Sequence, residues 1–220
     1  MVSPPLLKIC GLREPAQAAA IAGLGADAIG VIAVPSSPRF LPPAQRAELF
    51  AAMAGEASAC FGVLVVADPA DDQLEELSAA RGHAVVQLHG NESVERCRAL
   101  RRQLDVRLWK ALRVRSPADL ARAASYAAVV DALLLDAWVP GQLGGTGHRI
   151  PVGWLEGFRA PAPWWLAGGV GPATAADLLA RLHPDGLDAS SAVEDRPGVK
   201  NLERVAELVA VVRGSASGSV

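Results

Sequence analysis

The sequence has little of what marks a nucleic-acid-binding protein. Aromatic residues make up only 5% of the 220 residues, which leaves few surfaces on which single-stranded bases could stack. The 21 Lys and Arg residues are balanced by 23 Asp and Glu residues, and the net charge is −2. This balance gives no general attraction for nucleic acid or for an anionic membrane surface. We therefore expect neither of them as a partner.

Long apolar runs and paired cysteines are also missing. No stretch reaches the about 18 uninterrupted apolar residues of a membrane span, and the N-terminus lacks the pattern of a secretory signal. The three cysteines, Cys10, Cys60 and Cys97, lie far apart, without a CxxC or a Cys/His cluster. A disulfide framework and a structural zinc site are therefore not expected. These features predict a cytoplasmic protein without a metal.

Eight short apolar or β-branched runs are present, and their starts recur roughly every 21 to 33 residues. This is the length of a strand, a loop and a helix. Each run is apolar at consecutive positions, as in strands of a parallel sheet covered on both faces. The runs are Leu6–Cys10, Ala28–Val34, Cys60–Val66, Ala84–Leu88, Val106–Ala111, Ala132–Leu135, Trp164–Ala167 and Gly186–Ala189.

Segments with helical periodicity and helix start signals separate the runs. They begin at Glu14-Pro15, Pro42-Pro43, Asp71-Asp72, Asn91-Glu92, Ser116-Pro117, Pro172 and Asn201, with the poorest one at about Val152–Phe158. Eight strand–helix units predict a single-domain α/β protein with a (β/α)₈ barrel over residues 1–213. The tail, residues 214–220, is expected to be disordered. A doubly wound sheet is the alternative, but it requires no such even spacing, and no GxGxxG follows the first run.

In such a barrel the active site forms where the strands end. Gly168 and Gly169 follow the seventh run, while Asp188 lies near the end of the eighth and Ser190 and Ser191 follow it. Glycines and small residues let backbone N–H groups approach an anion, and these two loops often hold phosphate in barrels. A plain tight turn at the glycine pair is the alternative.

Four other residues follow strand ends. Cys10, beside Gly11, is a candidate nucleophile or general base if its thiol ionises. Asp136 follows three leucines, where lost solvation favours the protonated form and suits a general acid, although a loop-ordering role is as common. Arg39, between Pro38 and Phe40, is a candidate to bind a carboxylate or to make a surface ion pair. His89 could donate a hydrogen bond to substrate or serve the structure alone.

A base, an acid, a carboxylate-binding arginine and a phosphate site together suit proton transfer on a phosphosugar that carries a carboxylate. No nucleotide-binding GxxxxGK[ST] motif is present. Isomerisation of a small phosphorylated substrate is the reaction that fits best.

The chain resembles the phosphoribosylanthranilate isomerase family over nearly its whole length. The resemblance is carried, in order, by KICGL, GADAIGVI with PSSPRF, VQLHGNE, LLLDA with GGTG, LAGGVGP and DASSAVEDRPGVKN. It implies the Amadori rearrangement of N-(5′-phosphoribosyl)anthranilate to 1-(2-carboxyphenylamino)-1-deoxyribulose 5-phosphate in tryptophan biosynthesis. It implies no cofactor and no metal, and a monomer or a homodimer.

The resemblance also implies roles for individual residues. Asp136 would be the general acid, Cys10 the general base, and Arg39 the partner of the anthranilate carboxylate. Gly168, Gly169, Ser190 and Ser191 would bind the phosphate, while His89, Asp188, Gly144 and Gly145 would belong to the substrate pocket. The chain departs from the family pattern at Ala33, Ser36 and Ala192, where an aromatic residue, a lysine and a glycine are common.

Three other interpretations are open at this point. The related bifunctional isomerase of histidine and tryptophan synthesis is a barrel that has an aspartate at the end of its first strand. This chain has Cys10 there, which argues against that enzyme. Indole-glycerol-phosphate synthase has a lysine-centred site and an N-terminal extension, neither of which is seen. A non-catalytic barrel that binds a phosphorylated metabolite would have lost the acid or the base, whereas Cys10 and Asp136 are both present.

Overall fold

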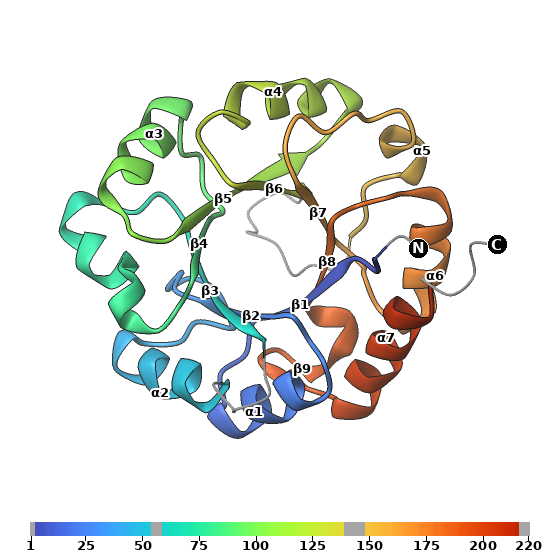
Figure 1. Cartoon of the computed structure of the whole chain (residues 1–220), viewed down its shortest axis with the longest axis horizontal. Coiled ribbons are helices and arrows are strands. Elements are labelled where there is room, and N and C mark those ends of the chain that lie inside the picture. The colour runs from blue at the N-terminus through green and yellow to red at the C-terminus, as the bar shows by residue number, and fades with distance from the viewer. Residues whose placement is uncertain (1–2, 54–58, 139–147, 216–220) are drawn as a thin grey trace.

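Eight parallel strands form a closed barrel in the computed structural model, which describes residues 3–53, 59–138 and 148–215 (Figure 1). The strands pair in chain order, and β1 pairs with both β2 and β8. The (β/α)₈ barrel predicted from the spacing of the apolar runs is therefore confirmed. The strands are β1 (Leu6–Cys10), β2 (Ala28–Ile32), β3 (Phe61–Val66), β4 (Val85–Leu88), β5 (Arg107–Val114), β6 (Ala132–Ala137), β7 (Trp164–Ala167) and β8 (Gly186–Ala189).

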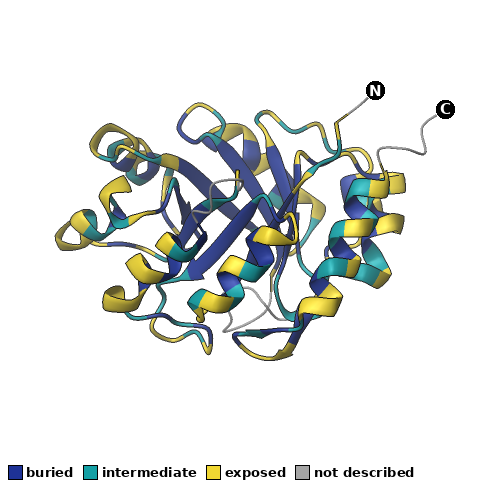
Figure 2. Cartoon of the chain, turned by 60° about the horizontal axis from the view of Figure 1, so that its bottom comes forward, coloured by how far each residue is buried: buried dark blue, intermediate teal, exposed yellow. Residues whose placement is uncertain are grey.

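Helices surround the barrel, and Figure 2 shows their exposed faces turned away from the buried strands. The α-helices are α1 (Pro15–Gly23), α2 (Pro43–Met53), α3 (Val94–Gln103), α4 (Ala123–Tyr126), α5 (Val152–Leu155), α6 (Pro172–Arg181) and α7 (Leu202–Gly214). The 3₁₀ helices are η1 (Asp71–Leu77), η2 (Ala79–Arg81), η3 (Pro117–Arg122) and η4 (Ser191–Val193), and a hairpin of β9 (Glu194–Arg196) and β10 (Val199–Lys200) follows η4. Within the described residues, no helix is long and apolar enough to cross a membrane.

Two predicted α-helices are wrong in type. The segment from Asp71 forms η1 and η2, because Ser78 between them has extended backbone with ψ of 148° and stops the first helix. The segment from Ser116 is 3₁₀ in η3 and α-helical only for the four residues of α4. The helix after β6, expected to be the poorest, is a single turn, α5. At the other end of the chain, α7 includes Gly214, where the tail was expected to begin, and residues 216–220 lie outside the described part.

Three aspartates fix the amino-terminal end of the barrel. Asp27, Asp131 and Asp185 directly precede β2, β6 and β8, and their Oδ2 atoms accept backbone N–H bonds from the neighbouring strands β1, β5 and β7. The distances are 2.6 Å to Leu7 N, 2.7 Å to Leu108 N and 2.8 Å to Trp164 N. The strands are thus held at the end that serves stability, which leaves the opposite end for the site.

The interior of the barrel is divided into an apolar and a polar part. Inward-facing side chains such as Val63, Val85, Trp109 and Trp165 fill the part near the amino ends of the strands. The centroids of the Trp109 and Trp165 rings lie 4.5 Å apart. Towards the carboxyl ends the filling becomes polar, with Lys8, Gln87 and Asp188 all at most 8% exposed. Lys8 Nζ joins this layer by donating to Gln87 Oε1 and to Asp188 Oδ2, whereas Asp188 Oδ1 has no hydrogen-bond partner among the described residues.

Candidate active site

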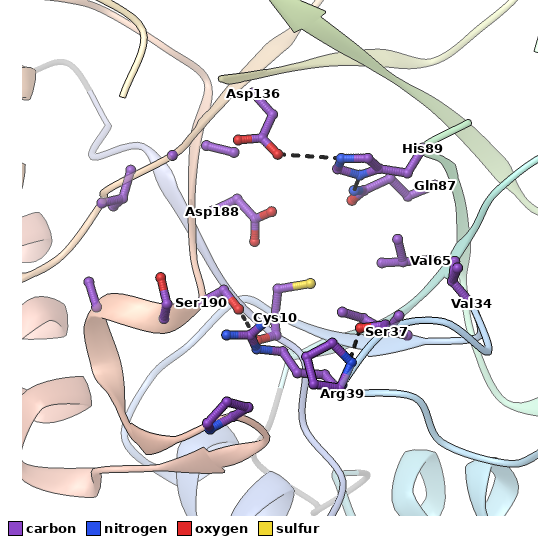
Figure 3. Close-up of a pocket in the computed structure, with 18 of the residues that line it drawn as sticks. Cys10, Val34, Ser37, Arg39, Val65, Gln87, His89, Asp136, Asp188 and Ser190 are labelled. Atoms are coloured by element: carbon purple, nitrogen blue, oxygen red, sulfur yellow. Dashed lines mark hydrogen bonds and ion pairs between the residues drawn. The ribbon is translucent and has the colours of Figure 1, made fainter. Parts of the chain in front are cut away.

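A cavity of about 520 Å³ opens at the carboxyl ends of the strands (Figure 3). Its lining brings together nine of the residues that the sequence singled out: Cys10, Arg39, His89, Asp136, Gly168, Gly169, Asp188, Ser190 and Ser191. Gly144 and Gly145, also predicted to belong to the pocket, lie outside the described residues. Positions as far apart in the chain as Cys10 and Ser191 meet here because β1 pairs with β8.

Cys10 is the last residue of β1 and faces the cavity. Burial raises the pKa of its thiol, while the charges of Lys8 and Lys200 act in the opposite direction and Asp188 adds to the rise. Gly30 of β2 makes room for the pair, since a Cβ there would lie 2.6 Å from Cys10 Sγ and 2.9 Å from Lys8 Cε. A thiolate at this position therefore needs the neighbouring ammonium groups.

Lys8 lies beneath the cavity next to Cys10 and was not among the residues predicted from the sequence. It is fully buried, and its Nζ donates to Asp188 Oδ2 at 3.1 Å and to Gln87 Oε1 at 3.0 Å. Although burial opposes its charge, Asp188 and Cys10 together raise the pKa of Lys8. Burial conversely raises the pKa of Asp188, against the effect of Lys8. The ammonium group is thus a fixed positive charge beside the thiol.

Asp136 and His89 are neighbours, and both lie on the side of the cavity opposite Cys10 (Figure 3). Asp136 Oδ1 accepts from the backbone N–H of Ala137 at 2.9 Å, and Oδ2 lies 3.4 Å from His89 Nε2. His89 Nδ1 lies 3.0 Å from Gln87 Nε2. The loop that carries His89 is fixed by a buried ion pair of 2.7 Å between Lys110 and Glu92. Glu92 accepts a hydrogen bond from the backbone N–H of Gly90, and Lys110 donates one to the carbonyl oxygen of Gly90.

Arg39 lies at the cavity, and its guanidinium is bound by a carboxylate of the protein itself. Its Nε and Nη2 donate to Glu194 at 2.9 and 2.8 Å, and Lys200 Nζ reaches the same carboxylate at 2.7 Å. Burial would raise the pKa of Glu194, but the bonds from the two cations outweigh it and lower that pKa. The surface ion pair considered from the sequence is therefore a buried one, and Glu194 and Lys200, on β9 and β10, are further residues that the sequence analysis missed.

The loops after β7 and β8 lie side by side at the cavity. Gly168 and Gly169 have φ of 89° and 65°, a left-handed conformation that residues with a Cβ rarely adopt. Ser190 Oγ donates to the carbonyl oxygen of Cys10 at 3.1 Å, so its hydroxyl ties the loop to β1. Ala192, where the family pattern has glycine, lies in η4 and is not at positive φ. The backbone at position 192 of this chain therefore does not require a glycine.

Comparison with known proteins gives a consistent result. Residues 7–211 match the family model described as N-(5′-phosphoribosyl)anthranilate isomerase. The enzyme of that name from Synechococcus elongatus is 48% identical over 203 residues, which cover 92% of this chain and 93% of the relative. The crystal structure of TrpF from Jonesia denitrificans is 32% identical, with a TM-score of 0.80 over 98% of this chain and 100% of that one.

A further solved structure is a phosphoribosyl anthranilate isomerase in complex with reduced 1-(o-carboxyphenylamino)-1-deoxyribulose 5-phosphate. It is 25% identical, with a TM-score of 0.78 over 96% of this chain and 99% of that chain. The family model spans residues 7–211, which include every residue that lines the cavity. The chain belongs to the N-(5′-phosphoribosyl)anthranilate isomerase family.

Proposed function

We propose that Asp136 and Cys10 are the general acid and the general base of the isomerisation that this chain catalyses. The enzyme is an isomerase of tryptophan biosynthesis, and its substrate is N-(5′-phosphoribosyl)anthranilate. The product, 1-(2-carboxyphenylamino)-1-deoxyribulose 5-phosphate, is an isomer of the substrate, so every proton taken up must be returned. A site with one acid and one base on opposite sides of a cavity meets this requirement.

The first step is assigned to Asp136. Its Oδ2 atom carries the proton that passes to the furanose ring oxygen, since Oδ1 is occupied by the N–H of Ala137. The C1′–O bond then breaks as the anilino nitrogen forms a double bond to C1′, which gives the open-chain Schiff base. Asp136 is left as a carboxylate, facing His89.

The second step is assigned to Cys10. Its thiolate takes the proton from C2′, and the electrons of the C–H bond move towards the iminium nitrogen to give an enolamine. Tautomerisation of the enolamine gives the ketone. The ammonium groups of Lys8 and Lys200 favour the thiolate. The protein itself therefore provides the positive charges that support the base.

The two ends of the substrate carry negative charge. Arg39, stiffened by Glu194, supports binding of the anthranilate carboxylate at the cavity. The loops of Gly168-Gly169 and Ser190-Ser191 support binding of the phosphate by backbone N–H groups. We place the enzyme in the cytoplasm, as a monomer or a homodimer, and residues 1–213 as its single catalytic domain.

The observation that carries the proposal is that Cys10 and Asp136 lie on opposite sides of one cavity (Figure 3), with the ammonium group of Lys8 acting on the Cys10 thiol. The test is a continuous assay of freshly prepared N-(5′-phosphoribosyl)anthranilate with Cys10→Ala and Asp136→Asn. We expect each to abolish turnover and to bind a reduced product analogue within a few-fold of wild type.

Cys97→Ala is the matched control, because Cys97 is buried in α3 outside the cavity and burial raises its pKa to about 11. It should turn over at the normal rate. If Cys10→Ala or Asp136→Asn turns over at the wild-type rate, the role assigned to that residue is wrong. If the unmodified protein is inactive in the assay, a non-catalytic binding barrel is favoured instead.

A further inference from the structure

A line of buried polar contacts crosses the barrel from the base side to the acid side. It runs from Lys8 to Gln87 at 3.0 Å, from Gln87 to His89 at 3.0 Å, and from His89 to Asp136 at 3.4 Å. We propose that Gln87 is a positioning residue that fixes the tautomer of His89, with the ring proton on Nε2, and thereby directs the proton of Asp136 towards the substrate. The proposal rests on the acid role assigned above to Asp136.

The orientation of the Gln87 amide follows from Lys8. An ammonium group has donors only, and Lys8 Nζ contacts Oε1 of Gln87. The reverse orientation would place an NH₂ group against NH₃⁺. Gln87 is 1% exposed, so water does not compete for either end of the amide. The carbonyl oxygen therefore faces Lys8, and the NH₂ group faces His89.

The tautomer of His89 follows from this amide. An amide nitrogen donates and cannot accept, so Nδ1 of His89 must supply the lone pair at 3.0 Å. The proton of a neutral ring then resides on Nε2, which points towards Asp136 (Figure 3). A proton on Nδ1 would meet the hydrogens of the amide, so this contact excludes both the other tautomer and the doubly protonated ring.

The consequence concerns the acid. Since Nε2 already bears a proton, His89 cannot accept one from Asp136, and Ala137 occupies Oδ1. A proton on Oδ2 therefore has the cavity as its outlet. At 3.4 Å the Nε2–H makes no hydrogen bond to any described residue. It can form one once Asp136 has become a carboxylate, and an interaction that strengthens as charge develops lowers the barrier.

The test reads the tautomer directly. In protein labelled with [¹⁵N]histidine, two-bond ¹H–¹⁵N correlation spectra show which ring nitrogen of each of the four histidines carries a proton. A His89→Gln variant assigns the His89 signals. In the wild-type enzyme we expect Nε2 of His89 to be protonated and Nδ1 to be bare.

Two variants separate positioning from a structural role. In Gln87→Glu a carboxylate oxygen replaces the amide nitrogen and can only accept a hydrogen bond, which places the proton of the neutral His89 ring on Nδ1. In Gln87→Met the contact is lost and both tautomers appear. We expect kcat to fall by about tenfold or more in each, which is part of the 10²–10⁴-fold that a positioned acid contributes in full, while KM changes less than threefold.

Gln45→Glu makes the same chemical change on the exposed face of α2 and should alter neither the spectrum nor kcat. The signals of the other three histidines report whether each variant is folded. A wild-type His89 with its proton on Nδ1 overturns the proposal, and so does a Gln87→Glu variant that keeps both tautomer and kcat. If Asp136→Asn keeps its activity, the acid assignment fails instead, whatever the tautomer of His89.

Discussion

Lys8 and Asp188 are direct neighbours across the seam between β1 and β8, and their side chains form a buried ion pair of 3.1 Å beside Cys10. The two charges act on the thiol in opposite directions, because Lys8 lowers the pKa of Cys10 and Asp188 raises it. Replacing either residue should therefore move the ionisation of the same thiol, and the two shifts should have opposite signs.

Lys8→Met should shift the ionisation of Cys10 to higher pH, and Asp188→Asn should shift it to lower pH. The measurement is the rate of alkylation of Cys10 by iodoacetamide as a function of pH, read by peptide mapping. Cys60, with a pKa raised to about 12 by burial, is the internal reference for slow labelling. Shifts of the same sign, or none in Lys8→Met, would contradict the electrostatic role of the pair.

Glu194→Gln should destabilise the protein strongly at pH 7. The change removes the charge of the buried carboxylate that Arg39 and Lys200 share, and breaking a buried pair costs about 3–5 kcal/mol. At roughly 2–4 °C per kcal/mol for a chain of this size, the melting temperature should fall by about 6–20 °C.

Glu156→Gln is the control for this prediction. The ion pair between Arg181 and Glu156 has the same 2.8 Å separation as the pair between Arg39 and Glu194, but both side chains are more than 40% exposed. Its loss should cost at most about 1 kcal/mol. Equal losses in the two variants would show that burial of the Arg39 pair has no energetic consequence.

Gly171→Ala should destabilise the loop after β7, and Ala192→Gly should rescue it. A Cβ on Gly171 would lie 2.7 Å from the Cβ of Ala192, while the next atoms are 3.9 Å away. The φ of Gly171 is −165°, which alanine adopts without strain, so the effect is one of packing alone. We expect a loss of about 1–3 kcal/mol in urea unfolding and a higher KM in the single variant.

The double variant, Gly171→Ala with Ala192→Gly, should regain most of both losses. The side chain of Ala192 occupies the space beside Gly171, which a glycine at position 192 would leave open. An additive outcome, with no recovery in the double variant, would rule out the direct contact.

His83 should make the stability depend on pH. It is 2% exposed, its Nε2 donates to the Leu77 carbonyl oxygen at 3.0 Å, and Nδ1 has no hydrogen-bond partner among the described residues. Burial lowers the pKa of His83 below the ordinary 6.5, against the effect of the Leu77 carbonyl. The unfolded chain then binds a proton at a higher pH than the folded one, so stability falls as the pH drops below about 6.5.

Urea unfolding at a series of pH values from about 7 to 5 measures this slope. In His83→Gln, which can still donate to Leu77, the slope should decrease even if the overall stability is lower. His183→Gln, at an exposed position, should leave the slope as it is. An unchanged slope in His83→Gln would assign the pH dependence to other groups.

The strands were predictable because each is a local apolar run, and the ends agree within a few residues. The exception is informative: β5 continues past Ala111 to Val114 because Arg113 and Val114 pair with Asp136 and Ala137. That pairing depends on a neighbour in space and is not visible in the local sequence. The 3₁₀ character of η1 and η3 was likewise set by backbone turns that the apolar periodicity does not encode.

The residues of the cavity were predictable where they stand at or just after the carboxyl end of a strand, and not where they lie further inside one. Lys8 and Gln87 look like interruptions of the apolar runs, yet each stands two positions before a predicted site residue, Cys10 and His89. Since side chains alternate along a strand, that spacing places them on the same inner face. Glu194 and Lys200 carried no such signal, because their partnership with Arg39 arises only when the hairpin of β9 and β10 folds against the loop after β2.

The seam between β1 and β8 joins the first and last strands of the sheet, and the contacts that tune the thiol cross it. A growing polypeptide therefore has Cys10 from the start, but Asp188 and Lys200, whose charges act on its thiol, are synthesised near the end and reach it only when the ring has closed. The electrostatic environment of the Cys10 thiol is thus completed late, when the terminal strands pair. Enzyme activity recovered during refolding would report the docking of the terminal strands rather than the formation of the individual βα units.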